Sequence, residues 1–199
     1  VEQAHFDLRV WRAEGYRYLL QLGLLGPELL PRAMASVREA ADAIPGYRGW
    51  DVQLDVLKRL CREDGEPMRA WLQALTDRST ASGLPGHVLV PRLGDLALCW
   101  GLLGESEQVA KLWSLAEPLI DSDLQPFERP AAMARFAEAL VLGGQQELGR
   151  VIFVAALEKA RAHQNPRSRA RAGADICLAL SRCGMDETSI AEHLDQLMG

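Results

Sequence analysis

The side chains that most often carry chemistry are scattered through this sequence. The four cysteines form no CxxC pair and the four histidines no HxxxH pair, the spacings typical of a thiol-redox motif or a local zinc site. The GxSxG, GxxxxGKS/T, GxGxxG and HExxH patterns of hydrolases, phosphate loops, dinucleotide sites and metalloproteases are also absent. We therefore expect no cofactor, no metal and no enzymatic activity.

One pair of acidic residues has a spacing that could serve catalysis. Asp51 and Asp55 are four residues apart, so on a helix they share one face, as a general acid–base or metal pair requires. Acids are also favoured in the first turn of a helix, where they complement the positive end of the dipole. We interpret the pair in this second way.

The charge pattern of residues 159–182 differs from that of the rest of the chain. This segment carries six basic residues and one acid, whereas the whole chain has a net charge of −5. Arg167, Arg169 and Arg171 follow a predicted helix start, where the dipole disfavours cations. Guanidinium groups near exposed backbone N–H groups suit a carboxylate or a phosphate, so these three arginines are candidates for anion binding. Alternatively, they pair with acids of a neighbouring element.

The elements that must position these side chains are predicted to be helices. Apolar residues recur at steps of three and four, for example at Met133, Phe136 and Leu140. Strand-like alternation is nearly absent, and the β-branched cluster at 151–154 lies inside a longer helical pattern. The sequence therefore predicts an all-α fold.

A glycine recurs in this helical pattern at an almost constant interval, each time shortly before an acidic residue. The spacings are 39, 39, 40 and 40 residues, and the positions are Gly26, Gly65, Gly104, Gly144 and Gly184. A fixed period of this length is typical of repeat proteins, whose units stack on their neighbours. We predict one domain over 1–199, built from five antiparallel helix–turn–helix hairpins at 8–44, 50–78, 88–121, 130–163 and 168–198.

The third and fourth units place small and large residues at matching distances from their glycine. These are Ala97, Trp100, Trp113 and Ala116 in one, and Ala137, Leu140, Phe153 and Ala156 in the other. The pattern resembles the tetratricopeptide repeat, in which small residues let paired helices approach closely. The resemblance implies a right-handed superhelix, an α-solenoid, although units of that family are about 34 residues long. It also implies that Trp100 and Trp113 belong to the core.

In tetratricopeptide arrays the first helix of each unit lines a concave groove that holds a partner segment. The resemblance therefore implies the following groove residues: Arg17, Asp55, Arg59, Asp95, Arg135, Glu138, Arg171, Asp175 and Arg182. Leu98 and Val141 are expected to supply apolar pockets. Trp50, which follows a glycine in a predicted loop, is a candidate for an exposed contact. The alternative for each charged residue is an ordinary solvated face.

Length and composition restrict the class of protein. The chain has 199 residues, 48% hydrophobic and 25% charged, which is enough to bury a core without disulfides. Its longest apolar stretches are far shorter than the roughly 20 residues of a membrane-spanning helix. The net charge of −5 argues against a general nucleic-acid binder. We expect a cytoplasmic protein with no membrane partner, and we interpret the first residue, Val1, as a sign of a piece of a larger chain.

Together these features predict a protein-interaction or regulatory scaffold module that binds a peptide or helix, acidic in character, in a concave groove. Such arrays resemble those attached to bacterial signalling proteins. The first alternative is a ligand-sensing domain that binds a small anion or peptide near residues 167–171. The second is an enzyme on a helical-repeat scaffold, such as a HEAT-like DNA glycosylase, which the acidic charge disfavours.

Overall fold

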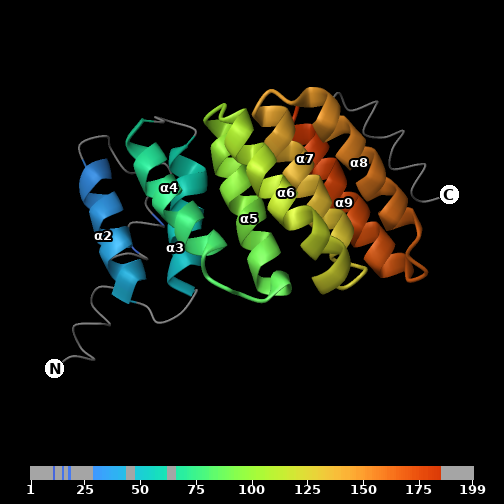
Figure 1. Ribbon diagram of the computed structural model, residues 1–199, viewed down its shortest axis with the longest axis horizontal. Helices are drawn as coiled ribbons and strands as arrows, with labels where there is room; N and C mark the ends of the chain where they lie inside the picture. Colours follow the sequence, from blue (N-terminus) through green and yellow to red (C-terminus); the bar gives the residue numbers. More distant parts are fainter. Residues whose placement is uncertain are drawn as a thin grey trace. The chain divides into compact units, whose positions relative to one another are not determined.

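The computed structural model describes residues 11, 15, 18, 29–43, 48–61 and 66–184. Within this part of the chain the regular elements are eight long helices and no strand, so the prediction of an all-α fold is confirmed there (Figure 1). No helix in the described part is both long and apolar enough to cross a membrane. The chain divides into two compact units, residues 1–75 and 76–199.

The first unit contains α2 (Leu30–Ala43), α3 (Arg48–Leu60) and most of α4 (Glu66–Thr80). Helix α2 packs on α3. The indole N–H of Trp71 on α4 donates to Oε1 of Gln53 on α3 at 2.7 Å, and both side chains are buried. The apolar core of this unit includes Leu54, Leu57, Leu60, Met68 and Leu72. Two of its helices, α3 and α4, therefore occupy the range predicted for the second hairpin.

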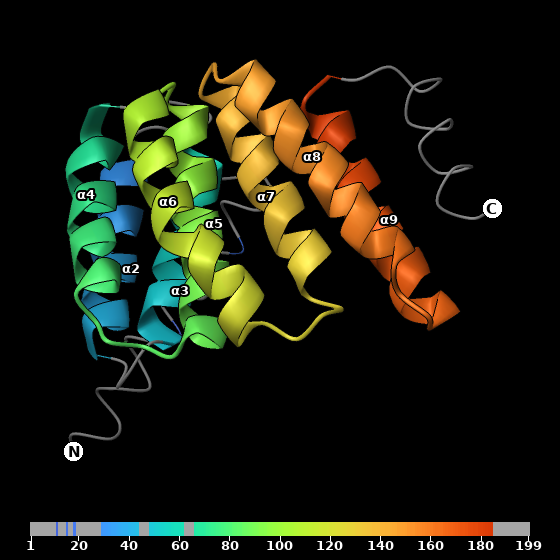
Figure 2. The same cartoon turned by 45° about the vertical axis from the view of Figure 1, so that its right-hand side comes forward.

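The described residues of the second unit contain the end of α4 and five complete helices, which alternate in direction (Figures 1 and 2). They are α5 (Gly86–Leu102), α6 (Ser106–Asp123), α7 (Arg129–Leu142), α8 (Gln146–Arg161) and α9 (Pro166–Arg182). Helix α7 packs against α5 on one side and α9 on the other, while α6 and α8 pack on the helices that precede them. Because α5, α7 and α9 run in the same direction, their amino-terminal ends lie at the same end of this unit.

The turns of the second unit use the glycines that recur in the sequence. Gly104, Gly144 and Gly184 have φ angles of +74°, +89° and +77°, a left-handed conformation that glycine adopts without a side-chain clash. After the first two glycines, the next N–H donates to the carbonyl five residues earlier at 2.9 and 2.8 Å, as in a Schellman C-cap. Gly26 and Gly65 lie outside the described residues.

The core of the second unit contains the small and large residues predicted from their distances to the turn glycines. There are eight such side chains, four in each of the third and fourth predicted units. All are buried, and none is more than 8% exposed. Trp113 packs against Phe136 with ring centroids 5.4 Å apart. The indole N–H of buried Trp100 donates to the hydroxyl of Thr76 at 3.1 Å. The interior placement of both tryptophans is therefore confirmed.

Three helices, α3, α5 and α9, begin two residues before the approximate hairpin starts predicted at 50, 88 and 168. Helix α9 begins at Pro166 instead of residue 168, because proline at the first helical position has no N–H to satisfy. The side chain of Asn165 caps this helix by accepting the N–H of Arg167 at 2.9 Å. Helix α5 begins at Gly86 instead of residue 88 and continues through Pro91.

Candidate binding cleft

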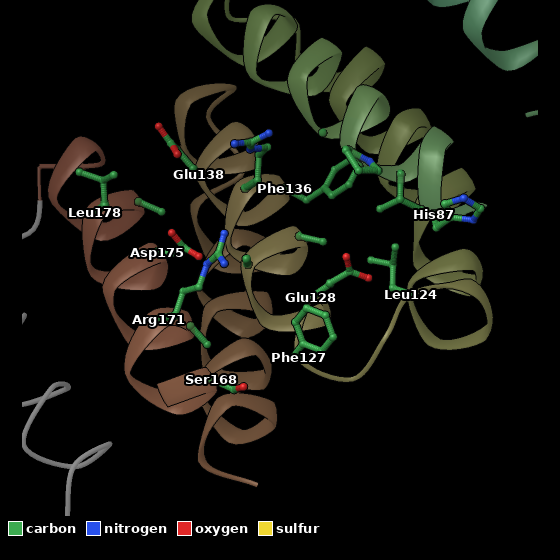
Figure 3. Close-up of a pocket in the computed structure, with 18 of the residues that line it drawn as sticks. His87, Leu124, Phe127, Glu128, Phe136, Glu138, Ser168, Arg171, Asp175 and Leu178 are labelled. Carbon is green, nitrogen blue, oxygen red and sulfur yellow. The ribbon is translucent and has the colours of Figure 1, made fainter. Parts of the chain in front are cut away.

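A cleft of about 770 Å³ lies on the second unit (Figure 3). Its lining comes from α5, α7, α9 and residues 124–128, which connect α6 to α7. Residues of α6 and α8 do not line it. The helices around the cleft are thus the first helices of the predicted third, fourth and fifth hairpins.

Two large apolar side chains of the cleft are half exposed. Phe127, in the connection before α7, is 52% exposed, and Leu178 on α9 is 51% exposed. Small residues of α7, Ala131 and Ala132, line the cleft between them. Burying such side chains against a partner would remove apolar surface from water at about 25 cal/mol per Å².

The connection that carries Phe127 is fixed by hydrogen bonds at both of its ends. The N–H of Gln125 donates to a carboxylate oxygen of Glu128 at 3.1 Å. Nε of Arg129 donates to the carbonyl of Leu124, also at 3.1 Å. The aromatic ring is therefore presented on an ordered segment, which lowers the entropy lost when a partner binds.

Arg167 and Arg171 bring positive charge to the cleft from the first turns of α9. They are four residues apart and share one face of the helix. Among the described residues, neither has an ion-pair partner. The amino-terminal ends of α5, α7 and α9, the positive ends of their dipoles, lie at this same end of the cleft.

Ion pairs join neighbouring helices along the rest of the cleft. Arg135 on α7 donates to Asp95 on α5 at 2.6 Å. Gly94 leaves room for this arginine, since a Cβ there would lie 3.0 Å from Cδ of Arg135. One turn further along α7, Glu138 lies 3.6 Å from Nη1 of Arg182 on α9. These charges are largely neutralised within the protein.

Glu138 also affects a thiol at the end of α9. Burial, and second the negative charge of Glu138, raise the pKa of Cys183 to about 12. The thiolate is the reactive form of cysteine, so this side chain is a poor nucleophile near neutral pH. The cleft therefore gains no nucleophile from Cys183.

Five of the nine predicted groove residues line the cleft: Arg135, Glu138, Arg171, Asp175 and Arg182. Asp95 is paired with one of them. Asp55 and Arg59 belong to α3 of the first unit, and Arg17 lies outside the described residues. Leu98 is buried and Val141 packs beside Gly149, and neither of these two predicted apolar contacts lines the cleft.

The anion-binding candidates divide between the cleft and the rest of the surface. Arg167 and Arg171 line the cleft, whereas Arg169, on the same helix, does not. Asn165 already accepts the N–H of Arg167, so part of the hydrogen-bonding capacity of this helix end is used. Arg167 and Arg171 are therefore better placed to contact a ligand in the cleft than a ligand bound at the end of the helix.

The remaining candidates from the sequence lie on α3. Asp55 forms an ion pair with Lys58 at 2.9 Å, one turn away. Trp50 lies within α3 and not in a loop, and the side chains of Trp50 and Asp51 are outside the described part of the structure. Within that part, no group of three or more His, Cys, Asp or Glu residues could hold a metal ion.

The two half-exposed apolar residues, Phe127 and Leu178, are not among the candidates predicted from the sequence. Phe127 follows Pro126 between two predicted hairpins, and a large aromatic residue in such a polar connection was the available signal. Leu178 lies seven residues after Arg171, on the same face of α9.

Comparison with protein-family models, curated protein sequences and solved structures found no match.

Proposed function

We propose that this chain is a protein-interaction module that binds a segment of a partner protein in the cleft on α5, α7 and α9. The observation that carries the proposal is the half exposure of Phe127 and Leu178 within a hollow between ordered helices. Large apolar side chains in such positions are typical of the few residues that supply most of the binding energy of an interface.

The proposed architecture is a tetratricopeptide-like α-solenoid of five hairpins. Its support is the recurrence of left-handed glycines at Gly104, Gly144 and Gly184, together with matching buried positions between them. In such an array the first helices form a continuous binding face, and small shifts between units alter its curvature. The cleft of the second unit would be the part of this face that holds the partner.

The two alternatives have weaker support. Against a small-anion sensor, Arg167 and Arg171 are exposed and do not enclose a site. Against a DNA-binding enzyme, Glu128, Glu138 and Asp175 line the same cleft and would repel a polyanion. The cleft volume lies within the range of small-ligand sites, so phosphate and nucleotides belong in the binding tests.

The test is selection of binders from a random peptide library displayed on phage, followed by affinity measurements with labelled peptides. Leu178→Lys should weaken the selected peptides by about tenfold or more, since it places a charge at an apolar contact. Leu115→Lys is the matched control, because Leu115 on α6 is 48% exposed and does not line the cleft. Binders that tolerate both substitutions equally would contradict the proposal.

A further inference from the structure

We infer that the partner segment is acidic and lies in the cleft with its carboxylates at the amino-terminal ends of α5, α7 and α9. This inference rests on the proposed function. It concerns which chemistry the cleft selects and in which direction the segment lies.

Two arginines of α9 lie at the amino-terminal end of the cleft. Arg167 and Arg171 are exposed, line the cleft and have no ion-pair partner among the residues that the structure describes. A guanidinium group binds a carboxylate through two parallel hydrogen bonds, and one helical turn separates the two groups. They can therefore receive two acids of one segment.

The distribution of charge along the cleft determines the expected direction of the segment. The positive ends of three helix dipoles lie along this end of the cleft. The start of α9 carries Arg167, and Figure 3 shows His87, at the start of α5, across the cleft from Arg171. Toward the other end, Arg135 and Arg182 are already paired with Asp95 and Glu138. Asp175, one turn beyond Arg171, adds a carboxylate that lines the cleft. An acidic residue is consequently favoured at the first end and disfavoured further along.

The two half-exposed apolar side chains lie toward different ends of the cleft. Figure 3 shows Phe127, Ser168 and Arg171 toward one end of the cleft and Glu138 and Leu178 toward the other. The aromatic ring thus lies at the positive end, and the leucine lies on α9 between Asp175 and Arg182. The expected segment has acids beside a large apolar residue, followed by a second apolar residue for Leu178.

The acidic residues on the cleft wall argue for a peptide over a nucleic acid. Glu128, Glu138 and Asp175 line the cleft with the arginines. Glu128 lies at the positive end, at the N-cap of α7, and its carboxylate accepts the N–H of Gln125. A polyanion that ran the length of the cleft would also meet Asp175 and Glu138, whereas a peptide can place its acids beside the two arginines only. Nucleic acid is therefore a competing outcome of the test.

The experiment uses the full chain and a labelled peptide from the selection that depends on Leu178, together with a copy in which Asp and Glu are replaced by Asn and Gln. The double variant Arg167→Gln/Arg171→Gln should weaken the acidic peptide by about tenfold or more and leave the amide copy unchanged within about twofold. Arg169→Gln is the matched control, since this arginine lies on the same helix and does not line the cleft. Affinity for the acidic peptide should fall steeply with added salt.

The outcomes separate the inference from the proposed function. If the Leu178-dependent peptides lack acids, or bind the double arginine variant as tightly as the unaltered chain, the inference fails and the proposed function stands. If no selected peptide depends on Leu178, the proposed function fails. Arginine-dependent binding of single-stranded or duplex DNA, without such binding of the acidic peptide, would also overturn the inference.

A photoreactive group on the peptide tests the direction. On the acidic end it should label the connection around Phe127 or the first turns of α9, and on the other end it should label the region of Glu138 and Leu178. The reverse pattern, read by mass spectrometry of the cross-linked fragments, would overturn the assigned direction.

Discussion

Glu138 is a charged residue at a position that is almost fully buried. It is 4% exposed, and its carboxylate lies 3.6 Å from Nη1 of Arg182. Removing a charge from water is unfavourable unless partners compensate for the lost hydration. The neighbouring thiol of Cys183 is affected as well, because a thiolate there would be both poorly hydrated and close to this carboxylate.

We predict that Cys183 resists alkylation near neutral pH and reacts faster only as the pH rises toward its pKa of about 12. Glu138→Gln should shift this profile to lower pH. The shift should be smaller than the full rise in the pKa of Cys183, because burial is the larger cause of that rise. Cys177 is an internal control, since burial alone raises its pKa. Mass spectrometry of the alkylated tryptic peptides measures both sites in one sample, and circular dichroism checks the fold.

The same pKa has a consequence for stability. The folded-state pKa of Cys183 lies above the ordinary value of 9.0, so the native state binds the thiol proton more tightly than the unfolded state. The stability that the folded state gains from this tighter proton binding is complete below pH 9.0 and is lost as the pH rises toward about 12. A Cys183→Ser variant should therefore lose less stability across that range than the unaltered chain. An identical loss in the two proteins would contradict the assignment.

At the scale of elements, the distance between α5 and α7 depends on glycine. A Cβ at Gly101 would lie 2.4 Å from the carbonyl oxygen of Ala139, a backbone atom that cannot move aside alone. We predict that Gly101→Ala destabilises the fold by about 1–3 kcal/mol, because the helices must separate. The control is Gly15→Ala, since Gly15 is helical and has nothing within 4 Å of the added carbon. Thermal unfolding of both variants measures the difference, and equal midpoints would contradict the prediction.

Local features explain which elements the sequence could predict. The helices follow from apolar periodicity, and the turns follow from glycine, because the left-handed conformation at Gly104 and Gly144 disfavours other residues. The resemblance to tetratricopeptide repeats predicted Arg135 as a groove residue. Its pairing with Asp95 was not predicted, because that contact joins residues 40 positions apart and depends on how two hairpins pack. The position of Phe127 in a polar connection was a local signal, but its half exposure within a cleft depends on how α5, α7 and α9 pack.

At the scale of the whole molecule, net charge is a poor guide to what a partner meets. The chain carries −5, yet the two cleft arginines without ion-pair partners in the described part of the chain lie within one helix. Acids elsewhere on the surface reduce non-specific attraction of polyanions, and in the function that we propose the local charge of the cleft selects the ligand. The cleft of the second unit thus combines positive charge with apolar contacts inside an acidic protein.

The division into two compact units leads to a prediction for the whole chain. Every residue that lines the cleft belongs to 76–199, and the buried pair of Trp100 and Thr76 also lies within that range. In the repeat architecture that we propose, stability is approximately a sum over units and their nearest neighbours, so a block of hairpins can fold without the rest. We predict that a fragment of residues 76–199 is helical by circular dichroism, unfolds cooperatively and binds the selected peptide within about threefold of the full chain. A folded fragment that does not bind would show that the first unit contributes to the site, and an unfolded fragment would show that the second unit requires it for stability.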